Sequence, residues 1–147
     1  MKKVATIILN RNLPSVTDTL YKNILKYNKK YTDVYIVEAG SDSGNLSKNM
    51  TWNADWKEAK LNGLRYARGM NFGLSNLWRE GKFDKYEAFL LLTNDTEFKT
   101  KSFIKIFLDI FKKHPRLGIL SPCSKDWGEK KLIDKNSIKY FWYIHNT

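Results

Sequence analysis

The sequence predicts an α/β domain with a mostly parallel central sheet and flanking helices. Short apolar runs rich in β-branched residues recur along the chain, and segments with apolar residues at helical spacing separate them. Because these runs are apolar at successive positions, we expect strands covered on both faces, as parallel strands usually are. Their alternation with helices indicates a parallel sheet, and 147 residues suffice to bury a sizeable core.

Four strands are predicted. The first covers residues 4–9, VATIIL, in which every side chain is apolar or β-branched. The others are expected at residues 34–37, 88–92 and 118–120, each bounded by turn-forming residues. The polar stretch 45–53 is expected to be a loop.

Three helices are expected between and after these strands. The first begins at Ser15, where Ser15 and Asp18 have the spacing of a capping box. The last ends before His114, because a residue that precedes proline disfavours the helical conformation. The middle helix stops near Gly81 and presents one apolar face made of Tyr66, Met70, Leu74, Leu77 and Trp78.

The chain is strongly basic and contains one cysteine. Lys and Arg total 26 against 15 acidic residues, which gives a net charge of +11 and favours an anionic partner. Cys123 has no second cysteine for an internal disulfide, so a reducing compartment is expected. No apolar stretch reaches the ~20 residues of a membrane span. We expect a cytoplasmic protein, with peripheral membrane contact left open.

Polar residues follow three of the predicted strands, at the edge where open parallel sheets bind ligands. Each group alone is typical of an ordinary turn. Together they indicate a site for a base, a ribose and a diphosphate. The three groups are Asn10, Arg11 and Asn12; Glu38, Gly40, Ser41 and Asp42; and Thr93, Asn94, Asp95, Thr96 and Glu97.

Two common nucleotide sites are missing from the sequence. No glycine-rich fingerprint follows the first strand, which disfavours a dinucleotide-dependent oxidoreductase, and no GKS or GKT phosphate loop occurs. Another way to hold a diphosphate is through a divalent metal ion carried by carboxylates. Asp95 is the expected metal ligand.

Five segments resemble, in order, those of glycosyltransferase family two, whose members have the Rossmann-like GT-A fold. VATIILNRNLP is similar to the family's first strand and Thr-x-Asn turn, with Asn10 in the Thr position and Asn12 as the Asn. VYIVEAGSDSG resembles the turn whose acid, here Glu38, contacts the nucleobase. GLRYARGMNFGL resembles the small-residue helix, FLLLTNDTEF the strand with the DxD-type metal motif, and HPRLGILSP the next strand.

The resemblance implies an inverting, metal-dependent glycosyltransferase of polysaccharide biosynthesis. It implies transfer of a sugar from a nucleotide-diphosphate sugar to a hydroxyl of a glycan or lipid-linked acceptor, with Mn²⁺ or Mg²⁺ bound by Asp95. The implied nucleotide-sugar contacts are Asn10, Asn12, Glu38, Gly40, Ser41, Arg65, Asn71, Thr93, Asn94 and Asp95.

Two departures from the family limit this expectation. The metal motif reads Thr93-Asn94-Asp95, so its first carboxylate is absent. We expect residues 1–122 to form the donor-binding domain and residues 123–147 to begin a truncated acceptor-side region, so that the chain binds donor but transfers sugar poorly. The catalytic base is unassigned, with Asp126, Glu129 and Asp134 as available carboxylates.

Other interpretations stay open. The same sheet could be a non-catalytic nucleotide-sugar-binding module, a reading that the missing carboxylate favours. A nucleic-acid-binding domain ranks last and no nucleic acid is expected, because the basic residues follow no recognition motif. Trp52 and Trp56 either stack on a sugar or base, or cover an edge of the core, and the second role is the more common.

Overall fold

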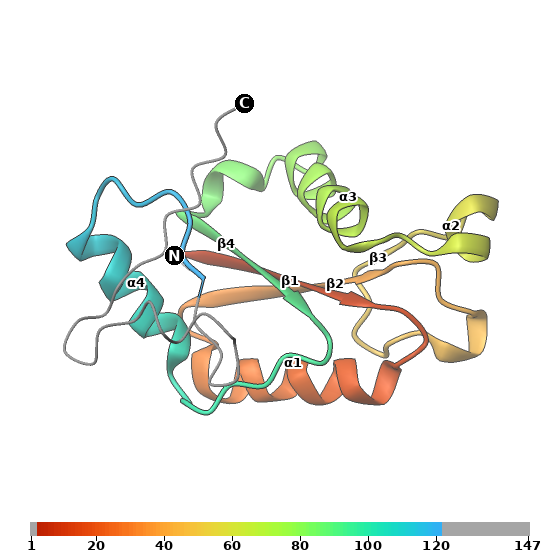
Figure 1. Ribbon diagram of the computed structural model, residues 1–147, viewed down its shortest axis with the longest axis horizontal. Helices are drawn as coiled ribbons and strands as arrows, with labels where there is room; N and C mark the ends of the chain where they lie inside the picture. The colour runs from red at the N-terminus through yellow and green to blue at the C-terminus, as the bar shows by residue number, and fades with distance from the viewer. Residues whose placement is uncertain (1–2, 122–147) are drawn as a thin grey trace, which may run out of the picture. The chain divides into compact units, whose positions relative to one another are not determined.

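The computed structural model describes residues 3–121, and the chain divides into two compact units, residues 1–105 and 106–147. The first unit holds a four-stranded sheet in the order β3-β2-β1-β4 (Figure 1). All neighbouring strands in it pair in parallel, so the predicted α/β class with a parallel sheet is confirmed. The strands are β1 Val4–Asn10, β2 Thr32–Glu38, β3 Trp52–Asn53 and β4 Ala88–Thr93.

The central strand, β1, is buried at all seven positions because strands pair with both its edges and helices cover both its faces. Its last residue, Asn10, pairs with Glu38 of β2, and Leu9 pairs with Thr93 of β4. The carboxyl ends of these three strands therefore lie level with one another. This register brings the three predicted polar segments to one edge of the sheet.

Helices cover both faces of the sheet. Helix α1, Pro14–Asn28, lies on one face and α3, Tyr66–Arg79, on the other (Figure 1). Short α2, Lys57–Asn62, precedes α3, and α4 is Phe103–Lys113. Single 3₁₀ turns, η1 and η2, lie at Ser43–Asn45 and Phe83–Lys85. Within the described part of the chain, no helix combines the length and the apolar character that a bilayer crossing requires.

One strand prediction and one loop prediction are wrong. Residues 118–120 form no strand, and Ile119 is 73% exposed. Within the expected loop 45–53, β3 pairs with Val37 and Glu38 of β2. A short apolar run or a two-residue strand leaves no periodic signal, because such a strand is defined by the partner that it meets.

The capping box predicted at Ser15 and Asp18 is also wrong. Pro14 is the first residue of α1, where its fixed backbone angle suits the helix and its missing N–H costs nothing. Ser15 therefore lies inside the first turn. Asp18 instead accepts hydrogen bonds from Ser47 and Asn49 in the segment after β2.

The apolar face predicted for α3 is only partly correct. Met70 and Leu77 are buried, but Tyr66 is 49% and Trp78 71% exposed. Gly69 and Gly73 take their place on the buried face. A Cβ at Gly73 would lie 3.0 Å from Ile7, so the missing side chains let the helix approach the sheet closely. Close backbone approach therefore sets which face of α3 is buried.

The two tryptophans of the predicted loop contact aromatic neighbours within the fold. Trp52 stacks on Tyr35 with ring centroids 5.1 Å apart, and Tyr35 packs against the core between the sheet and α3. The ring centroids of Trp56 and Phe72 lie 5.4 Å apart in an edge-to-face arrangement, and Trp56 remains 41% exposed. The core-edge interpretation therefore describes Trp52 well, and Trp56 keeps an open ring face.

Candidate functional site

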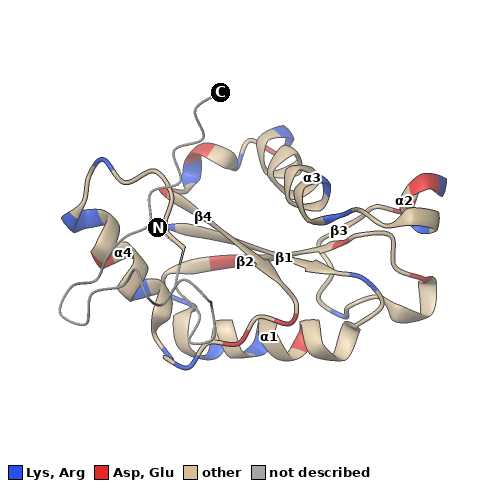
Figure 2. Ribbon diagram, viewed as in Figure 1, with Lys and Arg blue, Asp and Glu red and all other residues tan. Residues whose placement is uncertain are grey.

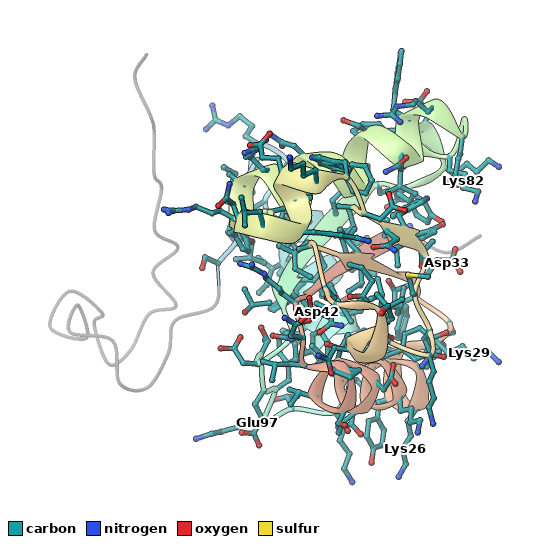
Figure 3. All side chains as sticks on the ribbon, turned by 90° about the vertical axis from the view of Figure 1, so that its right-hand side faces the viewer. Lys26, Lys29, Asp33, Asp42, Lys82 and Glu97 are labelled. Carbon is teal, nitrogen blue, oxygen red and sulfur yellow. The ribbon has the colours of Figure 1, made fainter. Side chains whose placement is uncertain are left out.

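The carboxyl edge of the sheet contains a topological switch point. Strand β2, the next in the sequence, pairs with one edge of β1, and the later strand β4 pairs with the other edge. Crevices at such points are where open parallel sheets bind ligands. Figure 3 shows this edge from the front, with Asp42 near its middle and Glu97 toward the α1 side.

Glu38 is fully buried at the end of β2 and is saturated by hydrogen bonds. Asn10 donates its side-chain Nδ2 to both carboxylate oxygens, at 3.0 and 2.9 Å. Ser41 Oγ donates at 2.6 Å and the backbone N–H of Ser47 at 2.7 Å. Its carboxylate therefore ties the segment after β2 to β1 instead of facing a ligand directly. The expected nucleobase acid is a positioning residue in this structure.

Asn10 joins the ends of three strands. Its Nδ2 donates to Glu38 of β2, while its Oδ1 accepts from Asn94 Nδ2, after β4, at 3.3 Å. The same Oδ1 accepts from Thr17 Oγ1 at 2.9 Å and from the Leu13 N–H at 3.1 Å, which fixes the start of α1. One amide thus holds three loops in a single wall.

A second link joins the β1 and β2 loops at the surface. The Asn12 N–H donates to Ser41 Oγ at 3.1 Å, and Asn12 Oδ1 accepts from the Asp42 N–H at 2.8 Å. Asn12 has a left-handed φ of +59°, which asparagine tolerates better than most residues. Gly40, with φ +88°, lies against the carbonyl of Ala59. Asn12 and Asp42 are exposed at this edge of the sheet.

Asp95 presents a free carboxylate beside this wall. Its side chain is exposed, and within residues 3–121 it makes neither a hydrogen bond nor an ion pair. Its neighbour Asn94 is held by Asn10 and Thr17, and Thr93 bonds with Thr96. A fixed Asn94 next to a free Asp95 orients one carboxylate at the switch point.

The donor set fits a metal ion that a substrate would help to hold. No group of three or more His, Cys, Asp or Glu side chains gathers in the part of the chain that the structure describes. Asp95 is an exposed carboxylate after β4, and exposed Asp42 lies after β2 at the same edge. Mg²⁺ is commonly bound by one or two protein carboxylates together with substrate phosphates. The site thus fits a metal–diphosphate complex better than a metal held by protein ligands alone.

The start of α3 reaches the same edge. The Leu64 N–H donates to the carbonyl of Ala39, after β2, at 2.9 Å, and this places Arg65 next to the end of β2. Tyr66 Oη donates to the carbonyl of Leu91 in β4 at 3.4 Å, and burial raises the pKa of Tyr66. Arg65 is exposed and precedes the unpaired N–H groups of the helix start. Asn71, one turn later, is also exposed.

Sequence reasoning missed several parts of this wall. Thr17 inside α1 and Ser47 in the long loop both bond to its core residues. Arg11, one of the predicted polar residues, donates Nη1 to the Asn62 carbonyl at 3.0 Å and so links the segment after β1 to the end of α2. Neither Thr17 nor Ser47 follows a strand, so the rule that located the other residues gave no signal for them. Arg68, in the first turn of α3, pairs with Glu58 at 2.9 Å.

No protein-family model, curated protein or solved structure matches this chain. The function must therefore be argued from the geometry of the carboxyl edge. The carboxylates considered as catalytic bases, Asp126, Glu129 and Asp134, lie outside the described residues.

Proposed function

We propose that this chain binds a nucleotide-diphosphate sugar at the carboxyl edge of its sheet and is the donor-binding part of a GT-A-type glycosyltransferase. The observation that carries the proposal is the wall built on Asn10, which joins the ends of β1, β2 and β4 beside the free carboxylate of Asp95. A fixed polar wall next to exposed Asp42 and Asp95 suits a ligand with a polar nucleoside and a diphosphate that carries a metal ion.

Each part of the edge has a distinct role in this proposal. Exposed Asn12 and Asp42 offer amide and carboxylate groups to the base and ribose, while buried Ser41 holds Asn12 in place. Arg65 and the N–H groups that begin α3 offset the charge of the phosphates. Buried Glu38 acts through Ser41 and Ser47, whose positions it fixes.

Asp95 would hold Mg²⁺ or Mn²⁺ together with the diphosphate oxygens. The metal ion would offset the charge that develops on the leaving diphosphate. In the transfer that the resemblance implies, the bond from the anomeric carbon to the diphosphate breaks as an acceptor oxygen bonds to the opposite face. The acceptor's proton goes to a general base that is not assigned.

The test is a thermal-shift titration of the full chain with UDP, GDP, ADP and their glucose conjugates, with Mn²⁺, with Mg²⁺ and with EDTA. A ligand at 100 times its Kd that binds only the folded state adds about 2.7 kcal/mol to the free energy of unfolding. We expect a rise in Tm with one nucleotide family, larger with metal. Asp95→Asn should remove the metal-dependent part, and Arg65→Ala should weaken binding with or without metal.

Asp84→Asn is the matched control, because Asp84 lies in η2, which precedes the amino end of β4. It should leave both the Tm and its shifts unchanged. The proposal is wrong if no nucleotide raises the Tm, or if Asp95→Asn and EDTA leave the shift intact.

A non-catalytic binding module is the second candidate, favoured by Thr93 in place of the first carboxylate of the metal motif. Release of the nucleotide diphosphate and transfer to an acceptor, measured separately from binding, distinguish the two. Binding without either reaction over a panel of donors and acceptors would favour the module.

A further inference from the structure

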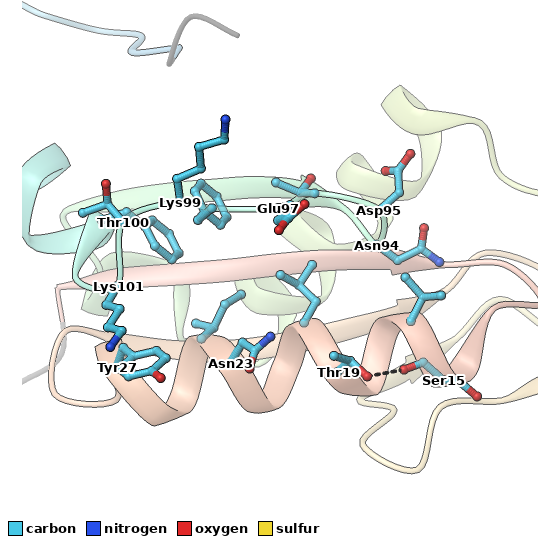
Figure 4. A pocket seen from close by; sticks show the side chains of 16 residues that line it. Ser15, Thr19, Asn23, Tyr27, Asn94, Asp95, Glu97, Lys99, Thr100 and Lys101 are labelled. Atoms are coloured by element: carbon cyan, nitrogen blue, oxygen red, sulfur yellow. Dashed lines mark hydrogen bonds between the residues drawn. The ribbon is translucent and has the colours of Figure 1, made fainter. Parts of the chain in front are cut away.

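A groove of about 710 Å³ runs between α1 and the segment that follows β4 (Figure 4). It starts at Asn94 and Asp95, next to the proposed donor site, and extends along α1 to Tyr27. Its apolar residues are Val16, Leu20, Ile24, Phe98 and Phe103.

Hydrogen bonds at two points, here called pins, fix the segment after β4 to α1 at the two ends of the groove. At one end Asn94 Nδ2 donates to Thr17 Oγ1 at 3.2 Å. At the other end Asn28 donates Nδ2 to the Lys101 carbonyl at 2.9 Å and accepts the Ile104 N–H at 3.3 Å. The eleven helical steps from Thr17 to Asn28 span about 16 Å. In the described structure no hydrogen bond joins α1 to residues 95–100 between these pins.

A polar row from α1 borders the groove. Ser15, Thr19, Asn23 and Tyr27 recur every four residues, which places them along one side of the helix. Ser15 and Asn23 make no side-chain hydrogen bond within residues 3–121, and Thr19 donates to the Ser15 carbonyl at 2.8 Å, which leaves its oxygen able to accept. Open hydroxyl and amide groups over an apolar floor suit a ligand with many hydroxyls and apolar ring faces.

The charge along the groove changes sign. Asp95 and Glu97 lie toward the donor site, while Lys101 lies beside Tyr27 at the far end (Figure 4). Lys101 Nζ is 5.5 Å from the centre of the Tyr27 ring, and Lys26 Nζ is 5.2 Å from the same centre. Both ammonium groups therefore lie near the Tyr27 ring, and Lys101 is the one of the two that lines the groove. Figure 2 shows Lys and Arg along α1 and on the segment near its far end.

We propose that this groove binds the acceptor, a glycan that carries a phosphate at its far end. The glycan's hydroxyl end would point to Asp95, and its phosphate would meet Lys101. The name "acceptor" rests on the proposed donor site, but binding of such a ligand does not. A nucleic acid fits less well, because its evenly spaced phosphates would approach Asp95 and Glu97. A lipid tail would leave the polar row of α1 unpaired.

The test is an NMR titration of the ¹⁵N-labelled full chain with cellotriose, maltotriose and chitotriose, each free and as its 1-phosphate. We expect one sugar series to shift the amide resonances of Thr19, Asn23 and Tyr27, with the phosphate form binding roughly tenfold tighter. Lys101→Gln should remove that preference. Lys22→Gln, an exposed lysine of α1 outside the groove lining, should keep it.

Asn23→Leu should weaken both forms of the sugar, and its amide spectrum reports whether the fold is kept. The proposal is overturned if no trisaccharide binds, if the phosphate gives no preference, if the shifted amides lie outside the groove, or if a hexathymidylate displaces the sugar. Nucleotide binding, measured separately, keeps the two proposals apart. Nucleotide binding without glycan binding overturns the groove alone, and glycan binding without nucleotide binding overturns the donor site and the name "acceptor".

Discussion

Glu38 shows at the scale of one residue how a polar side chain can build a site without facing it. Its two oxygens accept four hydrogen bonds from Asn10, Ser41 and Ser47, and no part of it reaches solvent. A buried polar group is tolerated when its partners are complete. The strand end is therefore specified by donors that converge on one carboxylate.

Replacing this carboxylate by an amide should destabilise the protein. In Glu38→Gln one acceptor oxygen becomes an NH₂ donor, which then faces Asn10 Nδ2 and either Ser41 Oγ or the Ser47 N–H. We expect the free energy of unfolding in urea to fall by about 1–3 kcal/mol. The control is Glu58→Gln, since Glu58 is exposed and paired only with Arg68, and it should cost less than about 1 kcal/mol. Equal effects of the two substitutions would contradict this role of Glu38.

Asp18 should make part of the stability depend on pH. Burial alone would raise its pKa, but hydrogen bonds from Ser47, Asn49 and the Lys48 N–H together lower it below the ordinary 3.8. A pKa that is lower in the folded state gives stability present above about pH 3.8 and lost as pH falls through the folded value. Asp18→Asn should therefore cost about 1 kcal/mol at neutral pH.

The check is urea unfolding of the wild type and Asp18→Asn at neutral pH and at successively lower pH. The difference between them should be constant near neutrality and shrink as the pH falls below about 3.8. A difference that is independent of pH, or that grows in acid, would show that the ionised carboxylate does not supply the stability.

At the scale of elements, Gly69 and Gly73 let α3 lie close to the sheet, and Gly40 lets the loop after β2 lie close to α2. A Cβ at Gly40 would lie 1.9 Å from the Ala59 carbonyl oxygen, and its φ of +88° already disfavours any side chain. Gly40 therefore permits a contact between loop and helix backbone that shapes one side of the crevice.

Gly40→Ala should lower the free energy of unfolding by about 2–4 kcal/mol, because clash and backbone strain add. Gly44→Ala is the matched control four residues later, since a Cβ there meets nothing within 4 Å and its φ is not in the left-handed region. It should change the stability by no more than about 0.5 kcal/mol. Similar losses in both variants would argue against the close approach at Ala59.

At the scale of the whole molecule, the net charge of +11 destabilises the folded state, because folding brings like charges closer together. Raising the ionic strength from about 0.01 M to about 0.1 M shortens the screening length from about 30 Å to about 10 Å. We expect the Tm in a calorimetric scan to rise by roughly 2–4 °C, equivalent to about 1 kcal/mol. Sodium chloride and sodium fluoride should act alike if screening is the cause. A Tm that is unchanged or lower would contradict it.

The sequence by itself determined the class of the fold and the edge where the candidate site lies. Continuous apolar runs identified β1, β2 and β4, because a strand buried on both faces needs apolar residues at successive positions. Parallel pairing then followed from the helices between the strands, and it placed Asn10, Glu38 and Asn94 at one edge. These inferences succeeded because each depends on local composition and on general rules of chain connection.

Only the tertiary structure decided what these residues do. Asn10 reaches Glu38 across 28 positions and Asn94 across 84 positions of the sequence. Whether a carboxylate is saturated like Glu38 or free like Asp95 depends on such distant donors. The two-residue strand β3 and the pins at the two ends of the groove likewise depend on partners far along the chain. Periodicity records how a segment presents its own side chains, whereas the partner that each side chain meets is set when distant segments pack together.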